Sequence, residues 1–100
     1  MAHASAGIGG CAGWPRDAAH PPHQLKVGPH RNVMVANPTH DPATPLANAV
    51  SLWLQIPEAR LLIADVDGHQ SLPLSRCAYE AQARFLADPS SASSTTLCGK

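Results

Sequence analysis

Two apolar runs of strand length, separated by one amphipathic segment, constrain the fold of this chain more than any other feature. The runs are residues 32–36 and 60–64, and each is followed by turn-forming residues, Asn37-Pro38 after the first and Asp65 to Gly68 after the second. Continuous apolar runs of this length are typical of strands buried on both faces, as in parallel sheets. The pattern therefore predicts a β-α-β unit with two parallel strands and a helix across one face.

The helix between the runs has clear predicted boundaries. Thr44 is placed to act as N-cap, Pro45 suits the first helical position, and Pro57 ends the helix. Helical spacing predicts a buried face made of Leu46, Val50, Trp53 and Leu54.

A second helix is predicted after the second run. Ser75 is its expected N-cap, and the helix should end before Pro89, because a residue preceding proline disfavours helical torsions. Its predicted buried face is Cys77, Ala78, Ala81 and Phe85. The polar segment 90–96 is expected to pack against nothing before Leu97 and Cys98.

The chain divides into residues 1–31, an irregular arm, and residues 32–98, the folded part. The arm carries four prolines and five glycines without any apolar periodicity. Two parallel strands and a C-terminal helix do not complete a stable sheet, because both faces and further strand edges need cover. The predicted class is α/β, and the chain is expected to form the end of a larger sheet.

Composition excludes several classes of function. Seven basic residues balance seven acidic ones, and this neutral charge argues against a nucleic-acid partner. No run approaches the roughly 18 apolar residues of a membrane span, and residues 1–13 do not have the pattern of a signal peptide. A hydrophobic content of 44% argues against intrinsic disorder.

Polar residues gather where the two predicted strands end. Asp41 follows the first strand and His69 follows the second. Functional groups of open α/β sheets lie beyond the carboxyl ends of the strands, so both side chains should reach the same edge. A carboxylate that holds one imidazole nitrogen leaves the other free to accept a proton. Asp41 could instead be a turn residue, and His69 a loop histidine without a partner.

These residues carry a family resemblance. The segments Asp41-Pro-Ala-Thr-Pro45, Asp67-Gly-His69 and Ser75-Arg-Cys77 resemble the C-terminal region of α/β-hydrolase serine peptidases, with flanking similarities at Cys11-Ala-Gly-Trp-Pro15 and Thr96-Leu-Cys98. The group they resemble is the tripeptidyl-aminopeptidase-like (TAP-like) enzymes of actinobacteria. The resemblance implies that Asp41 is the acid and His69 the histidine of a Ser-Asp-His triad.

The triad nucleophile is missing from this chain. The sequence contains no G-x-S-x-G elbow, which the resemblance assigns to the upstream half of the hydrolase fold. The implied partners are therefore that upstream half and, in the complete enzyme, a peptide substrate cleaved near its free N-terminus. The chain alone should be inactive. Two alternatives remain open: a non-catalytic module that docks on a separate hydrolase half, or part of an esterase with the same triad.

The resemblance also bears on the cysteines and the compartment. It implies an extracellular or cell-envelope enzyme, where a disulfide between Cys77 and Cys98 would pin the C-terminus and leave Cys11 unpaired within the chain. No cofactor or metal is expected. The glycines of Gly7-Ile-Gly-Gly10 follow no strand, and His20-Pro-Pro-His23 lies in an irregular arm that does not form a tetrahedral site. Asp65-Val-Asp-Gly68 lacks the other ligands of a calcium loop.

Overall fold

The computed structural model describes residues 12–70 and 72–99. Gly7 to Gly10 and Cys11, on which the sequence made predictions, lie outside these residues. The main elements follow the order β1 (Met34–His40), α2 (Leu46–Gln55), β2 (Arg60–Asp67), α3 (Arg76–Ala87) and β3 (Thr95–Cys98). Two short 3-10 turns, η1 (Leu72–Leu74) and η2 (Pro89–Ser91), flank α3.

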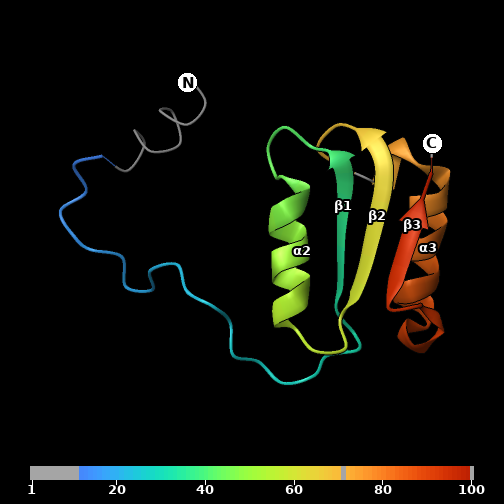
Figure 1. Cartoon of the computed structure of the whole chain (residues 1–100), viewed down its shortest axis with the longest axis horizontal. Helices are drawn as coiled ribbons and strands as arrows, with labels where there is room; N and C mark the ends of the chain where they lie inside the picture. The colour runs from blue at the N-terminus through green and yellow to red at the C-terminus, as the bar shows by residue number, and fades with distance from the viewer. Residues whose placement is uncertain (1–11, 71, 100) are drawn as a thin grey trace.

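The described residues form one parallel sheet with the order β1-β2-β3 (Figure 1). The predicted α/β class, with parallel strands and a C-terminal helix, is confirmed. The prediction that nothing packs before Leu97 is wrong, because β3 pairs with β2 from Leu61↔Thr95 to Ala64↔Cys98. A four-residue strand behind a serine-rich segment carries too little apolar periodicity to be recognised, while its backbone groups that face β2 gain ladder partners.

β1 continues past the turn residues that were expected to end it, and β2 includes Asp65 to Asp67 of its expected turn but ends before Gly68. Asn37 and Pro38 lie inside β1, where Pro38 pairs with Ala64. The N–H of Arg60 donates to the carbonyl of Val33, so by alternation the backbone of Pro38 faces the outer edge of β1. A missing N–H is tolerated at an outer edge, which explains why proline does not end the strand here.

The two helices cover opposite faces of the sheet. Leu62 and Ala64 of β2 pack with Ala78 and Ala81 of α3 in the main buried cluster. Successive side chains of a strand point to opposite faces, so Leu61, which is also buried, faces the side of α2. Small alanines at the α3 contact allow the helix to approach the sheet closely.

Helix α2 differs from its prediction in its N-cap and in one residue of its buried face. Its N-cap position is Pro45 and receives no side-chain hydrogen bond, so the prediction of Thr44 as N-cap is wrong. The Thr44 hydroxyl binds Asp41 instead. Ala49 is the buried residue of α2, whereas Leu54 is 70% exposed, because it lies at the margin of the helical stripe centred on Ala49 and Trp53.

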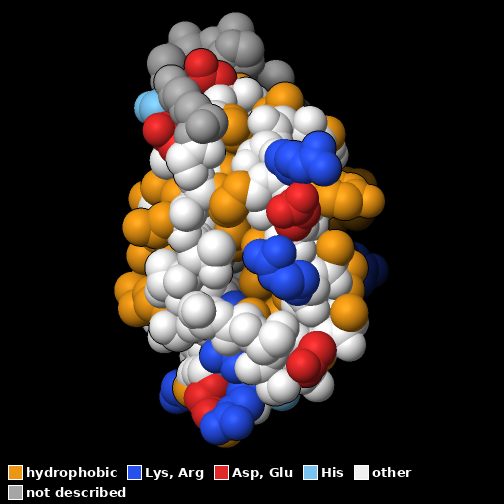
Figure 2. Space-filling view, turned by 90° about the vertical axis from the view of Figure 1, so that its right-hand side faces the viewer, with side chains coloured by type: hydrophobic (Ala, Val, Ile, Leu, Met, Phe, Trp, Pro, Cys, Tyr) orange, Lys and Arg blue, Asp and Glu red, His pale blue; other side chains and the backbone are white. Residues whose placement is uncertain are grey.

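Helix α3 begins as predicted. The Ser75 hydroxyl accepts a hydrogen bond from the N–H of Ala78, which confirms Ser75 as N-cap. Ala78, Ala81 and Phe85 form the buried face, but Cys77 is exposed and was wrongly placed on it. Figure 2 looks onto the side formed by α3 and β3, where hydrophobic side chains remain exposed among charged ones. The large exposed hydrophobic residues of these two elements are Tyr79, Leu86 and Leu97.

The β2-α3-β3 crossover has the less common, left-handed connection. Both crossovers step in the same direction across the sheet, but their helices lie on opposite faces, so their hands are opposite. Figure 1 shows α3 behind β3, with β3 to the right of β2 and all arrowheads up, which makes β2-α3-β3 the left-handed crossover. Such connections are right-handed in about 98% of cases, so this one is a rare exception.

A disulfide ties the two ends of this crossover together. Cys77 in the first turn of α3 is bonded to Cys98 at the end of β3, with a Cα–Cα distance of 5.7 Å. Cys98 is buried in the main cluster beside β2. The bond therefore holds the last strand and the start of the last helix in one place.

The irregular arm runs away from the sheet in the described residues from 12 onward (Figure 1). Near the sheet it contacts the segment that follows α2: the N–H of His30 donates to the carbonyl of Pro57, and the Arg31 guanidinium pairs with Glu58. In the described residues no helix is long and apolar enough to cross a membrane.

Removal of the Cys77–Cys98 bond is expected to destabilise the fold. A closed loop of about twenty residues corresponds to about 3 kcal/mol in the chain-entropy estimate. Denaturant unfolding of Cys98→Ser should therefore show a lower unfolding free energy than the oxidised parent chain, and Cys11→Ser is the matched control that should not. Peptide mapping without reduction that found Cys11 linked to Cys77 or Cys98 would contradict the assignment.

Candidate active site

The carboxyl ends of β1 and β2 bring the two predicted site residues together. Asp41 follows β1 directly, and His69 follows β2 after one glycine. Gly68 has φ +133, and its N–H donates to the carbonyl of His40 at 3.1 Å. This positive φ is one that side chains other than glycine rarely adopt, so the turn that presents His69 favours glycine, and a Cβ there would also require the Leu74 side chain to move.

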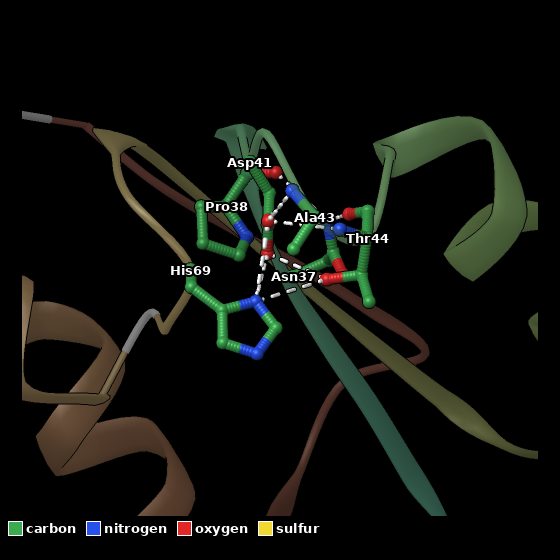
Figure 3. A network of polar contacts seen from close by, with 6 residues as sticks. All are labelled: Asn37, Pro38, Asp41, Ala43, Thr44 and His69. Carbon is green, nitrogen blue, oxygen red and sulfur yellow. Dashed lines mark hydrogen bonds and ion pairs between the residues drawn. The ribbon is translucent and has the colours of Figure 1, made fainter. Parts of the chain in front are cut away.

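The Asp41 carboxylate is held by donors from its own loop (Figure 3). Its Oδ1 accepts the N–H groups of Ala43 at 2.8 Å and Thr44 at 2.9 Å. Its Oδ2 accepts the Thr44 hydroxyl at 2.6 Å. The side chain is fully buried, so these three bonds replace the water that an exposed carboxylate would bind. The loop fixes both oxygens of the acid.

These contacts set the charge of the acid. Burial alone would raise the pKa of Asp41, but the hydrogen bonds from Thr44, Ala43 and His69 to the ionised form outweigh it and hold this pKa well below its usual range. Asp41 is therefore ionised at every physiological pH.

The hydrogen-bond geometry assigns the tautomer of His69. Its Nδ1 lies 3.2 Å from Asp41 Oδ2 and 3.4 Å from the Thr44 hydroxyl. The single hydroxyl proton of Thr44 is already given to Asp41, so this oxygen acts toward His69 as an acceptor. Both neighbours of Nδ1 accept, which places the proton on Nδ1 and leaves Nε2 free to take one.

The hydrogen bond between Asp41 and His69 is longer than the bonds that Asp41 accepts from its own loop. The shorter of the two Nδ1–carboxylate distances, 3.2 Å, exceeds the length of about 2.8 Å that is common for a charged pair. The His69 side chain is 59% exposed, and among the described residues its ring is bound by Asp41 and Thr44. Geometry of this kind tightens in many enzymes when substrate binds.

A second histidine–carboxylate pair lies at the same edge. His40 Nδ1 is 3.1 Å from Asp67 Oδ1, and the Thr39 hydroxyl donates to Asp65 Oδ1 at 2.9 Å. Sequence reasoning did not find this pair, although His40 and Asp67 stand opposite each other in the β1–β2 register. The Asp67 side chain is 83% exposed and lacks the internal donors of Asp41. Asp65 and Asp67 thus bind elsewhere, and Asp41 is the carboxylate that meets His69.

Comparison with known proteins identifies the family of this chain. The model of the family described as TAP-like protein, an α/β-hydrolase family, matches residues 1–98. The chain belongs to this family. No curated protein and no solved structure matches it at a significant level.

Membership in the TAP-like family identifies the fold of which these elements are a part. The three parallel strands and two helices are a part of an α/β-hydrolase fold, and the role of the chain is that of a hydrolase-family domain. Within residues 12–70 and 72–99, no three His, Cys, Asp or Glu side chains gather closely enough to hold a metal ion.

Thr44 is the residue of this site to which sequence reasoning assigned the wrong role. The spacing Asp41-x-x-Thr44 is the signal that could have shown it, since an aspartate commonly binds the backbone N–H groups two and three residues ahead. Proline at position 45 takes over the start of α2, so the Thr44 hydroxyl is free to bind the carboxylate.

The depressed pKa of Asp41 predicts how the site responds to acid. Because this folded-state pKa lies below that of the unfolded chain, ionised Asp41 contributes stability above the ordinary aspartate range and loses it as the pH falls toward the folded value. Carboxyl-carbon NMR should find Asp41 still ionised at about pH 3, where an ordinary aspartate is mostly protonated.

A matched pair of variants tests the cause of this shift. Thr44→Val should raise the pKa of Asp41, because it removes the hydroxyl that binds Oδ2. Thr39→Val removes the hydroxyl that binds Asp65 and should leave Asp41 unchanged. An Asp41 carboxyl that titrates in the ordinary range in the parent chain would contradict the described loop.

Proposed function

We propose that this chain supplies the acid and the general base of a serine-hydrolase triad, as the C-terminal part of a peptidase that releases short peptides from a free N-terminus. The observation that carries the proposal is the buried Asp41 carboxylate, fixed by three internal donors and facing Nδ1 of His69. The amide substrate and the N-terminal specificity come from the family resemblance.

The chemistry follows from the tautomer. With its proton on Nδ1, His69 offers Nε2 to a serine hydroxyl and takes its proton as the serine attacks the carbonyl carbon. The positive charge that forms on the ring is stabilised by Asp41, which stays ionised throughout. His69 then gives the proton to the leaving amine, and water hydrolyses the acyl-enzyme in a second round of the same transfers.

The serine must come from another part of the fold. The outer edge of β1 has no strand neighbour among the described residues, so a parallel strand of the upstream half can continue the sheet there. Pro38 offers no N–H to this edge, and its carbonyl accepts the Asn37 amide. Strand pairing can thus extend from Met34 to Ala36 and end below the site, which leaves the Asp41 loop open for the nucleophile.

The disulfide supports an oxidising compartment. A bond between Cys77 and Cys98 persists in secreted and cell-surface proteins and is rare in the cytosol of most organisms. An extracellular or cell-envelope location is therefore part of the proposal.

A chimeric enzyme tests the catalytic proposal. Residues 32–98 would replace the corresponding C-terminal region of an active TAP-like hydrolase, and turnover would be measured with a fluorogenic tripeptide amide and with an ester. The chimera should retain activity, and its Asp41→Asn form should lose turnover by a factor on the order of 10⁴, the scale the triad of serine proteases shows for the same change.

The second pair at the edge provides the control. Asp67→Asn removes an exposed carboxylate that also binds a histidine, and it should change turnover by less than about tenfold, as expected for an exposed ion pair. Equal losses in the Asp41 and Asp67 variants would contradict the assignment. Activity of the chimera on the ester but not on the amide would favour an esterase.

The genome offers an independent check. A reading frame with a G-x-S-x-G elbow directly upstream of this chain, in frame with it, is expected if the proposal is correct. Sequencing of the transcript would show whether both halves belong to one protein. A transcript without such an elbow, combined with a chimera that is inactive, would favour a non-catalytic module.

A further inference from the structure

We infer that Asn37 is a positioning residue that holds the loop carrying the triad acid in place. Asn37 is a residue of β1, and it is 7% exposed. Its Nδ2 donates to the carbonyl of Thr44 at 3.1 Å and to that of Pro38 at 2.9 Å (Figure 3). Nothing in the sequence pattern marked this residue, which was expected to form a turn.

The contact with Thr44 is the one that matters for the acid. Thr44 gives both its N–H and its hydroxyl proton to Asp41, and its carbonyl accepts from Asn37. One residue thus joins the strand to the carboxylate through three hydrogen bonds. A shift of Thr44 would move two of the three internal donors of Asp41 at once.

The Thr44 carbonyl has no donor from its own helix. The N–H of Asn48, four residues ahead, donates to the carbonyl of Pro45 at 3.0 Å. A carbonyl without a helical donor takes a partner from elsewhere, and the amide of the buried Asn37 donates to this one.

Asn37 is a suitable anchor because the strand around it is fixed. It pairs with Ile63 of β2 in the regular part of the parallel register, before the irregularity between Pro38 and His40. Both protons of its amide are used, so the side chain has one orientation that satisfies both carbonyls. A serine or an aliphatic residue could not donate twice.

The positioning of the loop can be tested on the full chain without reference to catalysis, and only its catalytic consequence rests on the proposed function. In the parent chain, NMR should detect scalar couplings across hydrogen bonds from Asn37 Nδ2 to the carbonyl carbons of Pro38 and Thr44. Absence of the coupling to Thr44 would overturn the inference, and this measurement needs no variant to fold.

Two variants then separate positioning from general stability. Asn37→Leu and Asn37→Asp both remove the donated bonds, the first without adding charge. Amide hydrogen exchange at Ala43 and Thr44 should accelerate at least about tenfold relative to Leu61, whose N–H binds Ser94. The carboxyl of Asp41 should titrate at higher pH in both variants.

The control is Asn48→Asp, the same chemical change on the exposed side of α2. It should leave exchange at Ala43 and Thr44 and the titration of Asp41 unchanged. Uniform acceleration at Ala43, Thr44 and Leu61 in the Asn37 variants would mean that Asn37 only stabilises the fold, and unchanged exchange would mean that it does not hold the loop. Either result would overturn the inference.

Discussion

A buried, ionised carboxylate is the constraint on which the rest of this structure depends. Burial of a charge without partners is costly, so the chain around Asp41 must provide donors at fixed positions. Ala43 and Thr44 provide them from the loop, and Pro45 rather than Thr44 takes the N-cap position of α2. The result is an acid whose direction is determined before any histidine approaches it.

The sheet provides the second requirement, which is to bring His69 to this acid. Parallel strands end at one edge, so residues 28 positions apart in the sequence meet without a long loop. The same edge also holds His40 against Asp67, and burial is what distinguishes the two pairs. An exposed carboxylate keeps its water and its mobility, whereas Asp41 has neither, which suits a residue that must orient a catalytic base.

The sequence predicted those parts of the fold that depend on local pattern. The apolar runs around Val35 and Leu62 identified the parallel pair, and Ser75 marked the start of α3. The missed features depend on partners distant in sequence: β3 forms because β2 offers a free edge, and Pro38 is tolerated because its backbone faces outward. The positions of Asp41 and His69 were accessible because topology alone sends both to one edge. The hydrogen bonds that Ala43 and Thr44 donate to Asp41 could not be predicted, because a threonine at position 44 is also a common N-cap residue.

The tautomer of neutral His69 is the most direct test of whether Asp41 orients this ring. Long-range ¹H–¹⁵N NMR of the chain near neutral pH distinguishes a proton on Nδ1 from one on Nε2. We predict that neutral His69 carries its proton on Nδ1, with an Nδ1 signal that changes in Asp41→Asn and stays the same in Asp67→Asn. A neutral ring protonated on Nε2, or a signal that does not respond to Asp41→Asn, would contradict the claim that Asp41 orients this histidine as a catalytic base.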